Sequence, residues 1–250
     1  MQYGICHLSI VPVRLIADDA SEMTTQLLYG DHFKVLEERK KWSRIRISYD
    51  QYEGWINNKQ FTIITEEAFQ TIEKLETTRY SADLVSSICT QKDILIPIAL
   101  GSSIHNLTLL SHRYEGNSIE GVMEKSNLIE TAALYVNAPY LWGGKTPFGI
   151  DCSGFTQMVH KINGYKLARN AVHQSEQGMA LSFIEESEPG DLAFFDNSEG
   201  VIDHVGIIMQ NNHIIHSYGK VRIDRLDHTG IFNNEIGNYT HKLRVIKKII

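Results

Sequence analysis

The chain reads GIDCSGF at residues 149–155, and this stretch places a single cysteine at the first turn of an expected helix. Backbone N–H groups at a helix N-terminus, with an imidazolium nearby, lower a thiol pKa from about 8.5 toward about 3.5–7.5. We therefore predict Cys152 to be a nucleophile, with a small buried core thiol as the alternative. The helix itself is indicated by apolar side chains at i, i+3, i+4 and i+7, which would pack on a core: Phe155, Met158, Val159 and Ile162.

Two downstream histidines could serve as a base and an orienting group for this thiol. His204 lies in the strand pattern DHVGIIM and His216 in HIIHSYG, with an Asn-Asn turn between them. Side chains alternate along a strand, so His213 and His216 must point to opposite faces, and only one can share a face with His204. We expect it to be His216, because its same-face neighbours are an isoleucine and a tyrosine, whereas His213 adjoins the turn.

Composition limits the classes of partner. The chain has 250 residues and is 42% hydrophobic, enough for one large domain or two to three small ones. The net charge of −6 argues against non-specific binding to nucleic acid or an anionic membrane, so we expect neither partner. The longest apolar run, near residues 94–100, is too short to span a bilayer.

Cysteine usage and the N-terminus bear on the compartment. Cys6, Cys89 and Cys152 are odd in number and lack CxxC spacing, which favours neither a disulfide framework nor a zinc ribbon and suggests a reducing compartment. Residues 1–14 have no basic region, long apolar stretch or cleavage site of a signal peptide. If Met1 is the native start, we expect a cytoplasmic protein; otherwise it would be periplasmic or secreted.

The N-terminal half indicates small β domains. Residues 4–61 contain five short strand patterns separated by turn signals, which predicts a small barrel. The order of these pieces resembles a bacterial SH3-like domain, with half of a generic β-sandwich as the alternative, and we place this domain at residues 1–62. Residues 63–120 are predicted to form a second, divergent SH3-like domain with a linking helix whose apolar face is Phe69, Ile72 and Leu75.

The last block, residues 121–250, is predicted to be an α+β domain. Its first helix would be capped by Ser126 and end before Pro139. A Gly-rich loop, the helix bearing Cys152 and a run of antiparallel strands would follow. The apolar face of the first helix is expected to be Ile129, Ala132, Ala133 and Val136.

Five ordered motifs in this block resemble the NlpC family of papain-like cell-wall cysteine peptidases. They read PYLWGG at 139–144, GIDCSGF at 149–155, PGDLAFF at 189–195, DHVGI at 203–207 and IIHS at 214–217. The separations of 52 residues from Cys152 to His204, and of 12 from His204 to His216, also suit the family. The resemblance implies an α+β fold, with a papain-like catalytic domain preceded by two small SH3-like barrels.

The resemblance also implies the catalytic roles. Cys152 would be the nucleophile, His204 the general base and acid, and His216 the group that fixes the tautomer of His204. Tyr140 matches the tyrosine whose hydroxyl helps bind the oxyanion with the Cys152 amide, although packing of its loop is an alternative role. Trp142 and its neighbouring glycines would shape the floor of the cleft.

The arrangement of domains resembles the γ-D-glutamyl-L-diamino acid endopeptidases, which recycle murein peptides. This implies a small murein-derived peptide as substrate, with no cofactor, and we expect a monomer. Glu22 is the candidate partner of the substrate's N-terminal amine and Tyr52 the candidate aromatic wall; each could equally be an ordinary surface residue.

One segment departs from the family pattern. The family's Arg-Asp-Ser segment appears here as Arg169-Asn170-Ala171, which removes a carboxylate and a hydroxyl from the expected amine site. Amine recognition would then rest on Asp151 and Glu22, or be weaker. The implied substrate-binding residues are Asp151, Ser153, Trp142, Glu22, Tyr52, Arg169 and Asn170.

Three other interpretations remain. A related amidase or acyltransferase would keep the catalytic set but use another acyl group, which the Asn170-Ala171 change favours. A non-catalytic murein-binding protein would not need an intact Cys and two His. A zinc site of Cys152, His204, His216 and Asp203 has suitable ligand types, but nothing else in the block is organised around a metal, so we expect none.

Overall fold

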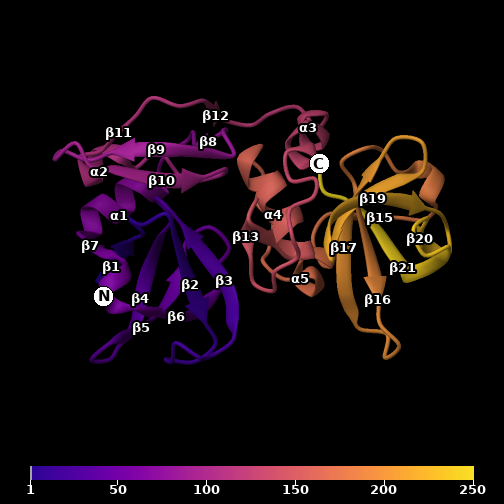
Figure 1. Ribbon diagram of the computed structural model, residues 1–250, viewed down its shortest axis with the longest axis horizontal. Coiled ribbons are helices and arrows are strands. Elements are labelled where there is room, and N and C mark those ends of the chain that lie inside the picture. The colour runs from indigo at the N-terminus through magenta and orange to yellow at the C-terminus, as the bar shows by residue number, and fades with distance from the viewer. Residues whose placement is uncertain (1) are drawn as a thin grey trace. The chain divides into compact units, whose positions relative to one another are not determined.

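The computed structural model describes residues 2–250 and divides into two compact units (Figure 1). Unit 1 comprises the described residues up to Val122 together with Trp142–Thr146. Unit 2 comprises Met123–Leu141 and Pro147–Ile250. Among the described residues, no helix has the length and apolar character needed to cross a membrane.

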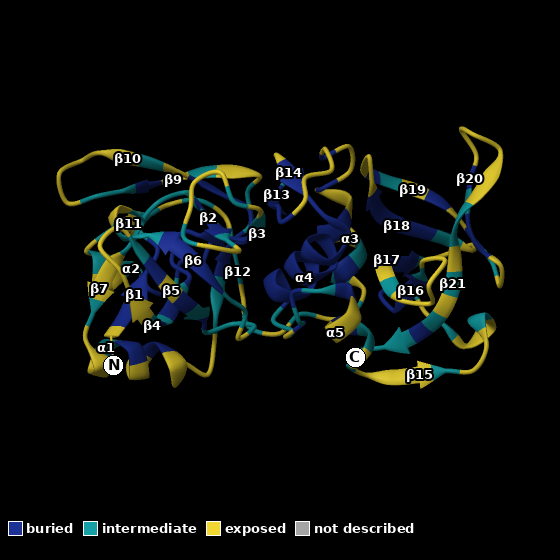
Figure 2. Cartoon of the chain, turned by 90° about the horizontal axis from the view of Figure 1, so that it is seen from below, coloured by how far each residue is buried: buried dark blue, intermediate teal, exposed yellow. Residues whose placement is uncertain are grey.

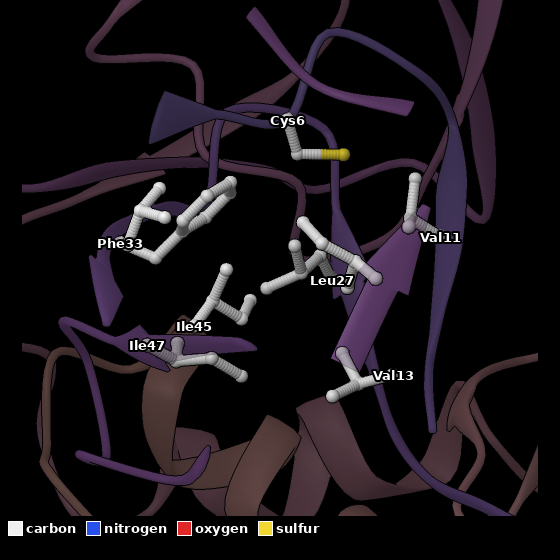
Figure 3. Packing of buried hydrophobic residues seen from close by; sticks show 9 residues of the cluster. Cys6, Val11, Val13, Leu27, Phe33, Ile45 and Ile47 are labelled. Atoms are coloured by element: carbon white, nitrogen blue, oxygen red, sulfur yellow. The ribbon is translucent and has the colours of Figure 1, made fainter. Parts of the chain in front are cut away.

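Unit 1 begins with a seven-stranded antiparallel sheet in the order β3-β2-β6-β5-β4-β1-β7. Alternation along its strands sends one face inward; in β5, Ile45 and Ile47 are buried while Arg44 is exposed. The inward side chains form the apolar cluster of Figure 3. This is the SH3-like domain expected from the sequence. Its strands are β1 (Gln2–Ile5), β2 (Ile10–Arg14), β3 (Met23–Leu28), β4 (His32–Glu38), β5 (Trp42–Ile47), β6 (Glu53–Asn57) and β7 (Thr62–Ile64), with a 3-10 turn η1 (Asn58–Gln60) before β7.

The expected linking helix follows as α1 (Glu66–Glu73). Thr65 caps it by accepting a hydrogen bond from the Ala68 N–H, at 3.2 Å. Phe69 and Ile72 are buried as predicted, whereas Leu75 lies beyond the helix end and is exposed. The helix therefore ends two residues before the third apolar residue, which does not reach the core.

The rest of the predicted second SH3-like domain, residues 63–120, forms two small sheets within unit 1. One has the order β10-β9-β11 and the other β12-β8. The elements are β8 (Arg79–Ser81), β9 (Val85–Cys89), β10 (Leu95–Ala99), α2 (Leu107–Leu110), β11 (Arg113–Tyr114) and β12 (Ser118–Glu120).

These sheets share buried contacts with the first barrel. The Ser103 N–H donates to the Tyr29 carbonyl at 2.8 Å, and its hydroxyl donates to Asp31 at 3.0 Å. Gly30 between them has φ +80°, and a Cβ there would lie 1.8 Å from the Ser103 carbonyl oxygen. Tyr29 also packs in a buried cluster with residues of the later strands. Residues 2–122 thus form one compact unit rather than two separate ones.

Unit 2 contains a sheet in the order β15-β21-β16-β17-β18-β19-β20. Strand β20 also pairs with β21, so six strands close on themselves and β15 is an added edge strand. The strands are β14 (Gly149–Ile150), β15 (Met179–Leu181), β16 (Leu192–Asp196), β17 (Ile202–Met209), β18 (His213–Tyr218), β19 (Lys220–Leu226), β20 (Gly230–Asn233) and β21 (Asn238–Lys248); β13 (Lys145–Thr146) belongs to unit 1. The helices are α3 (Asn127–Ala133), α4 (Cys152–Ile162) and α5 (Ala171–Ser175), with a 3-10 turn η2 (Ile184–Glu186).

The apolar face of α3 differs from the prediction. Ala132 is fully buried as predicted. Leu128, which was not predicted, is also fully buried, whereas Ala133 is exposed and Val136 lies beyond the helix end and is exposed. Ser126 occupies the N-cap position, but its side chain makes no capping bond. The buried face thus begins at Leu128, one residue before the predicted Ile129. Apolar spacing alone does not separate the two choices, because Leu128 and Ala132 also stand at i and i+4.

Helix α4 is buried along its whole length. All of its residues are buried, which Figure 2 shows as a continuous dark blue helix. The four predicted core residues, Phe155, Met158, Val159 and Ile162, are each fully buried. The helix packs against β17 and β18, so the N-terminal turn bearing Cys152 is fixed relative to the strands that carry the two histidines.

Candidate active site

The first turn of α4 is held by a buried ion pair. Asp151 is the N-cap, and its Oδ1 accepts the Gly154 N–H at 2.6 Å. Arg169 donates to both carboxylate oxygens, at 3.0 and 2.6 Å, and to the Ser153 hydroxyl at 3.0 Å. The Arg169 side chain is only 2% exposed. Three residues predicted to bind substrate, Asp151, Ser153 and Arg169, thus bond to one another and hold the backbone around Cys152.

Strand register brings the two histidines together. Gly206 pairs with His216 across β17 and β18, and His204 lies two residues before Gly206, on the same face. A Cβ on Gly206 would meet the His216 Cβ at 2.8 Å, so glycine permits this approach. His204 Nε2 lies 2.8 Å from His216 Nδ1. His213 points elsewhere and contacts the Asn211 carbonyl oxygen through Nδ1, at 2.7 Å.

Two residues that were not predicted from the sequence, Asp224 and Arg222, extend this pair. His216 Nε2 lies 3.0 Å from Asp224 Oδ2, and Arg222 donates to Asp224 through Nε at 2.7 Å and Nη2 at 3.0 Å. Both lie on β19, where Arg222 pairs with His216 and Asp224 follows on the same face. Tyr218 pairs with Lys220 on either side of Gly219. A tight turn predicted at Gly219 would have fixed the register of β18 and β19, and that register places Arg222 and Asp224 beside His216.

This chain of hydrogen bonds selects tautomers. The Asp224 carboxylate can only accept, so His216 donates from Nε2 and keeps its lone pair on Nδ1. His216 Nδ1 then accepts the proton of His204 Nε2. His204 Nδ1 consequently carries the lone pair that a general base needs.

Burial controls the protonation of the nucleophile and base. It raises the pKa of Cys152 to about 12, with a further contribution from the Asp151 charge. Burial also lowers the pKa of His204 well below its usual value, assisted by His216 and His241. Thiol and imidazole are therefore both neutral at pH 7. This differs from the expectation that the helix N-terminus would lower the thiol pKa, because desolvation outweighs the backbone N–H groups.

A third histidine, His241 on β21, covers the ring of His204. The two rings are stacked at 24°, with centroids 4.0 Å apart. Burial lowers the pKa of His241 to about 4, so it is neutral at pH 7. Nothing in the sequence pattern indicated this contact, because it depends on the pairing of β21 within the sheet.

One group of side chains could hold a metal ion. Ligand nitrogens of His204, His216 and His241 lie within 4.8 Å of one another. His204 and His216 already hydrogen-bond to each other through two of their nitrogens. This set differs from the one written from the sequence, since it contains His241 and lacks Cys152 and Asp203. Asp203 instead approaches the site with its backbone carbonyl, 3.8 Å from the Cys152 Sγ.

Tyr140 is anchored beside β14, the strand that immediately precedes Asp151 and Cys152. Its N–H donates to the Gly219 carbonyl at 3.0 Å, and it bridges Ile150 in parallel fashion. The side chain is 39% exposed. Burial, followed by the charges of Cys152 and Asp151, raises the pKa of Tyr140 to about 12. Its hydroxyl is therefore protonated at pH 7 and available as a donor.

The remaining predicted substrate-binding residues divide between the units. In unit 1, Trp142 Nε1 donates to Glu22 Oε1 at 2.6 Å, and the Trp142 side chain is 60% exposed. Tyr52, also in unit 1, is half-buried and packs against the barrel core. In unit 2, Asn170 is half-buried at the N-cap of α5, where its side chain makes no capping bond.

Comparisons with known proteins identify the families and the fold that this chain resembles. Residues 137–238 match the NlpC/P60 family, and residues 16–61 match the bacterial dipeptidyl-peptidase Sh3 domain. A γ-D-glutamyl-L-lysine dipeptidyl-peptidase of Bacillus cereus is 27% identical over 233 residues, covering 82% of this chain and 70% of the relative. Dipeptidyl-peptidase 6 of Lysinibacillus sphaericus is 24% identical, covering 83% and 85%. The crystal structure of an NlpC/P60 family protein from Bacillus cereus superimposes with a TM-score of 0.81 at 18% identity, covering 99% of both chains.

Proposed function

Because this chain is an NlpC/P60 cysteine peptidase with an N-terminal bacterial SH3-like domain, we propose that it hydrolyses the bond between γ-D-Glu and an L-diamino acid in murein peptides. The substrate would carry a free N-terminal L-Ala, as expected of an enzyme that degrades or recycles cell-wall peptides. The observation that carries the proposal is the relay His204–His216 beside the buried N-terminus of α4, in a chain whose relatives include a γ-D-glutamyl-L-lysine dipeptidyl-peptidase.

The reaction follows from the neutral resting state. The Cys152 sulfur attacks the γ-carbonyl carbon while its proton passes to His204 Nδ1, forming a tetrahedral oxyanion and an imidazolium. The Cys152 N–H and the Tyr140 hydroxyl donate to the oxyanion. Collapse of this intermediate breaks the C–N bond, and His204 gives its proton to the departing amine of the diamino acid. Water, deprotonated by His204, then hydrolyses the thioester.

Recognition of the substrate amine is assigned to Glu22. One of its oxygens accepts the Trp142 indole N–H, which orients the carboxylate, and a carboxylate has further acceptor positions for an ammonium. Asp151 is less suited to this role, because Arg169 and the α4 N-terminus already engage both of its oxygens.

The test compares L-Ala-γ-D-Glu-L-Lys with its N-acetylated form and its α-linked isomer, by mass spectrometry of the products. We expect cleavage of the free γ-linked peptide only. Glu22→Gln should raise KM, while the control Glu37→Gln, which removes an exposed carboxylate elsewhere in unit 1, should not. Equal cleavage of the acetylated peptide would show that the amine assignment is wrong.

A second candidate function is an amidase or acyltransferase with the same catalytic residues. Asn170 and Ala171 favour it, since they supply neither the carboxylate nor the hydroxyl expected of an amine site. A panel of acyl donors, including simple acyl amides and an added amine acceptor, separates the two functions. Faster turnover of donors without a γ-D-Glu group would favour this alternative.

A further inference from the structure

The orienting group of this site is an imidazole, and an imidazole needs orientation of its own. A carboxylate in that position could only accept a hydrogen bond, whereas neutral histidine exists in two tautomers. If His216 carried its proton on Nδ1, two donors would face each other across the 2.8 Å separation from His204 Nε2. His204 would then have to move its own proton to Nδ1 and lose the lone pair that accepts the thiol proton.

We propose that Asp224, held by Arg222, is a positioning residue that keeps His216 in the Nε2–H tautomer and thereby keeps His204 Nδ1 available as the base. This inference rests on the catalytic roles of Cys152, His204 and His216 and does not depend on the identity of the substrate. The four side chains form one hydrogen-bonded relay, in which His204, His216 and Asp224 are buried and Arg222, 12% exposed, is the last member.

Burial strengthens the hold of Asp224 on the tautomer of His216. Its side chain is 2% exposed, so its hydrogen bond to His216 Nε2 is not exchanged with water. A buried carboxylate is costly unless it is paired, and Arg222 supplies two donors to its two oxygens. The pairing holds the pKa of Asp224 below its usual value in spite of burial. The carboxylate therefore stays an acceptor at neutral pH.

Arg222 is itself fixed from a second strand. It donates to Glu235 through Nη1 at 2.8 Å and to the Asn233 side-chain oxygen through Nη2 at 3.1 Å. Asn233 is the last residue of β20, so the guanidinium ties β19 to the end of the neighbouring strand. Rotation of Asp224 would break its hydrogen bonds to His216 and to this fixed guanidinium, so the Asp224–Arg222 pair can hold the tautomer of His216.

Asp224→Asn tests the tautomer directly, because the side chain keeps its shape but its amide can donate as well as accept. In protein labelled with ¹⁵N-histidine, ring-nitrogen chemical shifts distinguish the two neutral tautomers. We expect Nε2–H for both His204 and His216 in the wild type, and a second tautomer of His216 in Asp224→Asn. Nδ1–H on His216 in the wild type, or unchanged shifts in the variant, would overturn the proposal.

Enzyme kinetics provide a second test of the role of Asp224. We expect Asp224→Asn to lower kcat by about 10- to 100-fold, by analogy with the loss on removing the hydrogen-bond partner of a metal-ligating imidazole, and to leave KM within about twofold. Asp227→Asn is the matched control: it removes a nearby carboxylate that bonds Tyr239, and should leave kcat unchanged. A proportional loss in both variants, or a change confined to KM, would refute a positioning role.

Alkylation of Cys152 by iodoacetamide, followed on its peptide by mass spectrometry, needs no substrate. We expect slower labelling in Asp224→Asn at pH 7, with Cys89 labelling unchanged as an internal control. If the wild type cleaves no murein peptide, the proposed function fails while this measurement still decides the role of Asp224. If Asp224→Asn does not fold, Arg222→Gln replaces it, with slower labelling expected and an unchanged rate contradicting the proposal.

Discussion

Replacement of Asp151 by alanine should destabilise unit 2 strongly and do so through Arg169. The change removes the N-cap of α4, worth about 0.5–2 kcal/mol. It also removes the carboxylate that pairs with the Arg169 guanidinium, whose side chain is only 2% exposed. Breaking a buried pair by removing one partner costs about 3–5 kcal/mol, and we expect the total in this range because the two losses share the same oxygens.

Hydrogen exchange of peptides from 152–162 in urea is the appropriate assay. All three tryptophans lie in unit 1, so their fluorescence reports on the other unit. Arg169→Met and the double variant complete a mutant cycle, and the double variant should be more stable than the sum of the single losses by about 2 kcal/mol. A loss below about 1 kcal/mol in Asp151→Ala, or additive single losses, would refute this account of the ion pair.

Three further predictions concern the same unit. Gly206→Ala should lower kcat at least tenfold, because the new Cβ would meet the His216 Cβ at 2.8 Å; unchanged turnover would show that β17 and β18 adjust freely. The thiolate ultraviolet absorbance of the wild type, measured against Cys152→Ala, should be absent at pH 7 and appear only in strongly alkaline solution, because the pKa of Cys152 is raised to about 12; a thiolate signal at pH 7 contradicts the neutral resting pair. Burial lowers the pKa of His160 and of His241 to about 4, so the unfolded chain binds more protons than the folded chain between pH 6.5 and pH 4. The melting temperature of unit 2 should therefore fall as the pH is lowered from 6.5 toward 4, and His160→Gln should make this fall smaller. A melting temperature independent of pH would contradict the prediction.

The sequence predicted the parts of the site that depend on local periodicity. The stripe behind Cys152 gave the buried face of α4, and strand alternation separated His216 from His213. Local patterns were less successful at the ends of elements. Val136 and Leu75 were placed on apolar faces, but α3 and α1 end before them. Helix ends depend on tertiary packing that a repeat of apolar residues does not record.

The residues that sequence reasoning missed depend on strand register. Asp224 lies beside His216 only because the chain turns back at Gly219, between β18 and β19. His241 stacks on His204 only because β21 pairs with β16 in the same sheet. The partners of Asp151 were also hidden, because Arg169 follows it by 18 residues and the ion pair forms only when both are buried. Motifs therefore located the proposed nucleophile and base, whereas the groups that orient them could be found only from the fold.

We propose that Cys152 cleaves the γ-D-Glu–diamino acid bond. The decisive measurement is digestion of a mixture of murein peptides with wild type and with Cys152→Ala, followed by sequencing of the products by mass spectrometry. The wild type is expected to release L-Ala-D-Glu from peptides with a free N-terminus, and Cys152→Ala to release none. Equal release by Cys152→Ala, or wild-type cleavage at other bonds only, would contradict the account.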